Sequence, residues 1–79
     1  MRTGFDWRAL QEAMEHRREI TIEATVNGYA VTMRTLKAGR AWGVPMVVQL
    51  RVERGNVTWL QTFETVEEME GRLHEQTQI

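Results

Sequence analysis

The sequence contains no cysteine and no serine, and only one proline among its 79 residues. Without cysteine there can be no disulfide framework, thiolate zinc site, iron–sulfur cluster or cysteine nucleophile. Without serine a Ser–His–Asp triad is impossible. The longest apolar stretch, residues 44–48, is far shorter than the roughly 20 residues of a membrane-spanning helix. The first ten residues lack the apolar segment of a secretory signal, so we expect a cytoplasmic domain with no contact to a membrane.

Catalytic side chains are also scarce. The only histidines are His16 and His74, and the only aspartate is Asp6. A general acid–base site needs titratable groups gathered in a pocket, and each histidine with its neighbouring glutamates supplies at most two of the three or four ligands of a metal site. There is no glycine-rich phosphate-binding loop. We therefore expect no enzymatic activity, no metal and no cofactor.

The residues that are present indicate one small globular domain spanning residues 1–79. Hydrophobic residues make up 42% of the chain and charged residues 27%, which is typical of a folded domain. Below about 80 residues a single core rarely supplies more than about 3–5 kcal/mol of net stability. The domain must therefore pack efficiently, pair with a second copy of itself, or gain stability from a partner.

The first predicted element is a helix over residues 6–18. Asp6 is a suitable N-cap, because its carboxylate can accept a backbone N–H of the first turn. Phe5 and Leu10 have the spacing of a hydrophobic staple across this cap. The last turn is expected to hold three basic residues that complement the helix dipole: His16, Arg17 and Arg18.

Four strands follow, because the apolar residues then recur with a period of two. Asn27-Gly28 is the strongest signal for a hairpin, since a type I′ turn needs positive φ at both central residues. A loop over residues 37–44 separates this hairpin from a second one, whose strands cover residues 46–53 and 57–63. A final helix over residues 66–76 begins with a capping box at Thr65 and Glu68.

This order of elements, αββββα, predicts an α+β two-layer sandwich. Its four-stranded antiparallel meander carries both helices on one face. A small Sm-like barrel with a terminal helix is the alternative, although a second helix and only four clear strands count against it.

Charge is distributed unevenly along the chain, although the net charge is only −1. Residues 34–54 hold five basic residues and one acidic residue, for a net charge of +4. Residues 55–79 hold one arginine and five glutamates, for a net charge of −4. The basic segment includes Trp42, which lies in the glycine-flanked loop. Trp42 either caps the end of the core or stands at the surface.

These features predict a non-enzymatic protein-binding domain, a regulator, inhibitor or subunit of the kind that many bacteria and phages encode. Arginine and tryptophan are enriched at the centres of protein interfaces. The outward sheet face is also expected to carry more apolar surface than water requires, at Ala30, Leu36, Val47 and Leu60. Self-association into a homodimer is a second way to cover it. The predicted contact residues are Arg34, Lys37, Arg40, Trp42, Arg51 and Leu60.

The alternative function is binding of single-stranded nucleic acid. A flexible basic loop with an aromatic side chain can stack a base beside a phosphate contact, and Arg34 and Arg51 share the outward face with several threonines. Two observations count against it. The sequence pI is about 6.1, below that of most nucleic-acid-binding domains, and Arg34 is placed to pair with Glu23 across the hairpin.

Overall fold

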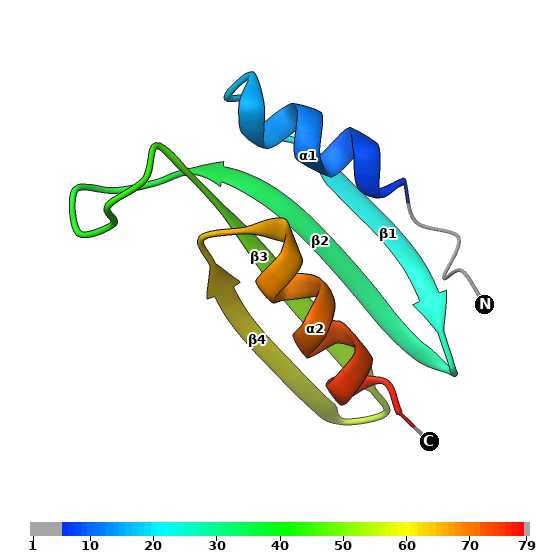
Figure 1. Ribbon diagram of the computed structural model, residues 1–79. Coiled ribbons are helices and arrows are strands. Elements are labelled where there is room, and N and C mark those ends of the chain that lie inside the picture. Colours follow the sequence, from blue (N-terminus) through cyan, green and yellow to red (C-terminus); the bar gives the residue numbers. More distant parts are fainter. Residues whose placement is uncertain (1–5, 79) are drawn as a thin grey trace.

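The computed structural model describes residues 6–78 and confirms the predicted αββββα order (Figure 1). Both helices pack on one face of a four-stranded antiparallel sheet with the strand order β1-β2-β3-β4. The sheet is open, so the Sm-like barrel is the wrong alternative. The elements are α1 (Trp7–Glu15), β1 (Thr21–Val26), β2 (Tyr29–Lys37), β3 (Met46–Arg54), β4 (Val57–Phe63) and α2 (Val66–Gln76).

The two tight turns have the backbone that their residues favour. Asn27 and Gly28 between β1 and β2 have φ values of 50° and 82°, the positive pair of a type I′ turn. Between β3 and β4 only Gly55 is positive, at 61°, as in a type II′ turn. Both two-residue loops match the right-handed twist of the strands they join. Val26 therefore lies opposite Tyr29 in the first hairpin, and Arg54 lies opposite Val57 in the second.

The core lies between the sheet and the helices. Alternation sends every second strand residue to the helix side, where leucine, valine, methionine and phenylalanine side chains from both layers meet. All of them are at most 5% exposed: Leu10, Val31, Met33, Val48, Leu50, Val52, Phe63, Val66, Met69 and Leu73. Burial of this apolar surface is what holds the two layers together.

Helix α1 begins as predicted. The Asp6 carboxylate accepts a hydrogen bond from the backbone N–H of Ala9 at 3.1 Å, which satisfies a donor that the first helical turn leaves free. Leu10, one turn further along, is fully buried in the core. The predicted contact of Leu10 with Phe5 lies outside the described residues.

The predicted end of this helix is wrong by three residues. Helix α1 ends at Glu15 because Arg17 adopts a left-handed conformation with φ of 57°. The N–H of Arg18 then bonds the carbonyl of Ala13 at 2.8 Å, and that of Arg17 bonds Met14 at 3.4 Å. This is the hydrogen-bond pattern of a Schellman motif. No basic residue lies in the last turn; the three basic residues form the reversal that follows it.

A fully buried threonine of β2 holds this reversal against the sheet. The hydroxyl of Thr35 donates to the carbonyl of Arg18 at 2.6 Å and accepts from the N–H of Ile20 at 2.8 Å. The N–H of Thr35 in turn donates to the carbonyl of Ile20 at 3.0 Å. Thr35 lies opposite Val48 on the helix side of the sheet, and these bonds explain how a polar residue is accommodated there.

Helix α2 is fixed at both ends. At its start the Thr65 hydroxyl accepts from the N–H of Glu68 at 3.2 Å and donates to the Glu68 carboxylate at 3.1 Å, so the predicted cap is confirmed. At its end the carbonyl of Thr77 accepts from the side-chain amide of Asn27 at 2.8 Å. The first hairpin turn is thereby linked to the end of the last helix.

One predicted surface residue is buried. Val47 points away from the helices by strand alternation, yet it is only 4% exposed. It lies opposite Leu36, which is half-buried. Both residues stand at the end of the sheet from which the β2–β3 loop leaves. There the N–H of Ala38 donates to the carbonyl of Pro45 at 2.9 Å and closes the loop. Neighbours at this end of the sheet thus shield a side chain that alternation alone places in water.

Between residues 6 and 78, no helix has the length and apolar character that crossing a membrane requires.

Candidate binding surfaces

No element within the described part of the chain covers the second face of the sheet (Figure 1). The cross-strand register arranges its side chains in rows that run across the four strands. Two adjacent rows at the centre of this open face consist of Thr21, Arg34, Gln49 and Thr62, and of Glu23, Thr32, Arg51 and Leu60.

Three of the six predicted contact residues come together on the open face. Arg51 lies directly opposite Leu60, and Arg34 belongs to the adjacent row. Leu60 is 55% exposed, which is unusual for a leucine on a strand. Arg51 forms an ion pair with Glu53 at 2.8 Å. The predicted pair of Arg34 with Glu23 is not formed, because Glu23 lies opposite Thr32.

The open face is electrically neutral. Its outward side chains include two arginines, Arg34 and Arg51, and two glutamates, Glu23 and Glu53. The short ion pair compensates one of the two arginines directly. Neutrality deprives a polyanion of the counterion-release energy that drives nucleic-acid binding.

The other three predicted contact residues lie elsewhere. Lys37 ends β2 on the helix side, and its backbone N–H donates to the Glu19 carboxylate at 3.1 Å. Arg40 is exposed in the loop that projects from the end of the sheet (Figure 1). Trp42 is 38% exposed, so it stands at the surface. The six predicted residues therefore do not form one continuous site.

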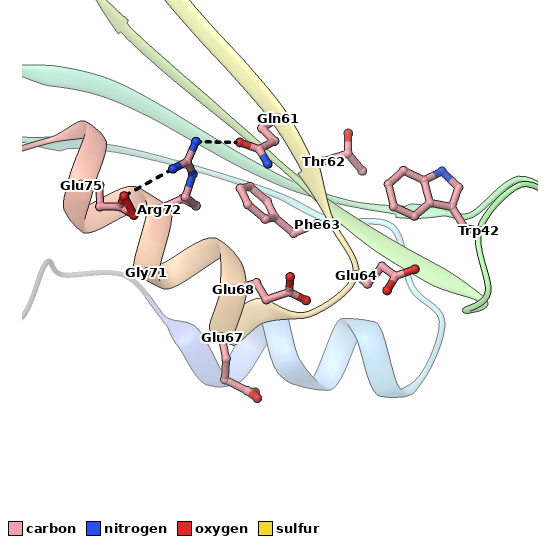
Figure 2. Close-up of a pocket in the computed structure, with 10 residues that line it drawn as sticks. All are labelled: Trp42, Gln61, Thr62, Phe63, Glu64, Glu67, Glu68, Gly71, Arg72 and Glu75. Carbon is pink, nitrogen blue, oxygen red and sulfur yellow. Dashed lines mark hydrogen bonds and ion pairs between the residues drawn. The ribbon is translucent and has the colours of Figure 1, made fainter.

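Trp42 stands at one end of a groove that the sequence patterns did not indicate (Figure 2). The groove has a volume of about 520 Å³ and runs between β4 and α2. Strand β4 contributes Gln61, Thr62 and Phe63, the connection to α2 contributes Glu64, and α2 contributes Glu67, Glu68, Gly71, Arg72 and Glu75.

Arg72 connects the two sides of this groove. One guanidinium nitrogen contacts the Gln61 side-chain oxygen at 3.4 Å and another the Glu75 carboxylate at 3.3 Å (Figure 2). The guanidinium carbon also lies 5.6 Å from the centre of the Trp59 ring, within the range of a cation–π interaction. Gln61, which interrupts the apolar face of β4, is explained by this contact.

The groove is acidic. It is lined by four glutamates and one arginine, and the arginine is already paired with Glu75. Glu64 and Glu67 form no ion pair with the described residues, and the Glu68 carboxylate accepts a hydrogen bond from the Thr65 hydroxyl at 3.1 Å. The acidic segment was visible in the sequence as the net charge of −4, but its position beside an edge strand was not.

Metal coordination finds no support in residues 6–78, where no group of three or more histidine, aspartate or glutamate side chains could hold an ion. In comparisons with known proteins, no family model, no curated protein and no solved structure matched this chain. The functional argument therefore depends on the two surfaces alone, the open face and the groove.

Proposed function

We propose that the chain is a non-enzymatic cytoplasmic protein-binding domain that acts by occupying a partner's surface with the open face of its sheet. The observation that carries the proposal is the exposure of Leu60 beside Arg51 on a neutral, uncovered sheet face. An exposed apolar side chain next to an arginine is the composition of an interface centre, and the surrounding threonines can form its polar rim.

The size of the open face is consistent with this role. Four strands about 4.8 Å apart and about six residues long give a projected area of roughly 400 Å². A standard interface buries about 800 Å² on each partner. The β2–β3 loop, with Arg40 and Trp42, extends beyond the end of the sheet and can supply much of the remainder.

The neutral face favours a protein over a nucleic acid as the partner. Titration with a fluorescent single-stranded oligonucleotide at two salt concentrations separates the two functions. Nucleic-acid binding requires affinity at low salt that falls steeply as salt rises. We expect no binding at low salt.

The direct test compares two exposed apolar residues on opposite faces of β4. Leu60→Asp changes the open face, and Val57→Asp changes a residue that is 71% exposed on the helix side. Each protein is used to retain binding partners from host extract. We expect Leu60→Asp to lose the partner that wild type and Val57→Asp both retain.

Equal retention by all three proteins would remove the open face as the binding surface. The double variant Arg40→Ala, Trp42→Ala tests the contribution of the loop in the same assay. Native mass spectrometry identifies a second copy as the partner if wild type is a dimer and Leu60→Asp is a monomer.

A further inference from the structure

Strand β4 has a free backbone edge. It is the last strand of the sheet, and no other described segment pairs with its outer side. The hairpin closes with Arg54 opposite Val57, and the closing pair of a two-residue hairpin exchanges both backbone hydrogen bonds. Because bonded and non-bonded pairs alternate, Thr58, Leu60 and Thr62 direct their N–H and C=O groups away from β3. This edge can therefore accept another strand.

The acidic groove lies beside this edge. Glu67 and Glu68 belong to the first turn of α2, where negative charge also stabilises the helix through its dipole. Glu64 directly precedes the N-cap Thr65, at the same end of α2. None of these three glutamates forms an ion pair with a described residue, so their charge is available to a basic partner.

Gly71 keeps the helical wall of the groove low. Glycine is a poor helix former, and its use in a helix interior calls for a packing reason. A Cβ atom built on Gly71 meets no atom within 4 Å, so the packing of the chain on itself does not require glycine. Gly71 itself lines the groove.

From the free edge, the acidic walls and the open space at Gly71, we propose that the groove binds an extended basic segment of a partner protein, which adds to β4 as a fifth strand. The inference rests on the proposed function in taking the partner to be a protein. In such a complex the backbone bonds supply affinity and alternate side chains supply specificity. Every second side chain of the added strand faces the glutamates and should be lysine or arginine.

The intervening side chains of the added strand face the open side of the sheet, next to Leu60. Apolar residues are expected there, so that basic and apolar residues alternate along the segment. A second copy of the chain is a poor occupant of the same edge. Pairing β4 with β4 of another copy would bring two acidic grooves together, and like charges in proximity are repulsive.

The probe is a heptapeptide in which lysine and valine alternate, since β4 is 7 residues long. Two comparison peptides carry glutamate in place of lysine, or proline in place of valine. The proline peptide keeps the positive charge but removes the backbone donors at the substituted positions. Calorimetry measures the affinities, and amide NMR shifts locate the binding site.

We expect only the lysine–valine peptide to bind, more weakly as salt rises, and to shift the amides of Thr58, Leu60 and Thr62. Equal binding of the proline peptide would show attraction without strand addition and would overturn the inference. Shifts confined to the β1 edge would overturn it as well, as would a wild-type dimer joined through β4.

Two variants test the groove itself. Removal of three charges by Glu64→Gln, Glu67→Gln and Glu68→Gln should weaken the peptide by about tenfold. The matched control neutralises three glutamates outside the groove and the open face, Glu12, Glu15 and Glu70, and should change the affinity by less than about twofold. Equal losses in the two triple variants would assign the effect to net charge and refute the groove.

The second variant, Gly71→Leu, fills the groove and should abolish binding. His74→Leu places the same side chain on an exposed position of α2 outside the groove and should have no effect. Circular dichroism verifies that both variants are folded. If the peptide fails to bind while Leu60→Asp still loses its partner, the groove inference fails and the proposed function stands. If the peptide binds while Leu60→Asp retains its partner, the open-face proposal fails instead.

Discussion

The hydroxyl of Thr35 is the group whose removal tests most directly how the segment after α1 is held to the sheet. Thr35→Val replaces this hydroxyl with a methyl group of nearly the same volume. The substitution leaves the apolar contacts of the buried side chain almost intact. It removes the bond donated to the Arg18 carbonyl and the bond accepted from the Ile20 N–H.

The cost follows from the two backbone groups that lose their partner. Each buried polar group left without a hydrogen bond costs about 1–3 kcal/mol. Both bonds are only partly buried, so the lower part of this range applies, and we expect a total of about 2–3 kcal/mol. A single core in a chain of this length rarely supplies more than about 3–5 kcal/mol of net stability. The substitution should therefore remove a large fraction of it.

Urea unfolding, followed by tryptophan fluorescence, measures the effect against Thr35→Ser. The serine variant keeps the hydroxyl and loses only a methyl group, at a cost of about 1 kcal/mol. We expect wild type to be the most stable, then Thr35→Ser, then Thr35→Val, with similar slopes in urea. A valine variant more stable than the serine variant would refute the reasoning, because packing would then outweigh both hydrogen bonds.

Three further substitutions test separate features. Arg17→Gly relieves the left-handed backbone at the end of α1 and should stabilise the fold by about 1 kcal/mol; an unchanged thermal midpoint would contradict this. Gly71→Ala should add about 0.5–1 kcal/mol in calorimetry, because the new methyl meets no neighbour, and a loss of stability would reveal an unseen packing constraint. Asn27→Asp replaces the donor to the Thr77 carbonyl and should cost about 1 kcal/mol, with faster amide exchange at the end of α2; unchanged exchange would show that the bond contributes nothing.

The hairpins were predictable because two independent signals coincide. The apolar alternation defines the register of β1 and β2, and Asn27-Gly28 stands where that register needs a two-residue turn. The end of α1 carries no such signal. Arg17 is a residue type that rarely adopts positive φ, and the reversal is held by Thr35 on a distant strand.

Of the two candidate surfaces, the open face was predictable from the sequence and the groove was not. Strand alternation correctly groups Arg34, Arg51 and Leu60 on the open face, because side-chain direction on a strand follows position alone. The groove depends on how α2 packs against β4 and on how the β2–β3 loop brings Trp42 near Glu64. Contacts between elements that are distant in the chain do not produce a periodic pattern in the sequence, so the groove could not be predicted from it.

The bond between Asn27 and the Thr77 carbonyl joins residues 50 positions apart, and it has a consequence during synthesis on the ribosome. The sheet is translated before α2, whose Met69 and Leu73 complete the core. Until that helix emerges, the apolar face over β3 and β4 lacks its cover. We therefore expect the native packing to form only after α2 has been translated, with the nascent sheet as the species most exposed to chaperones and to premature edge pairing.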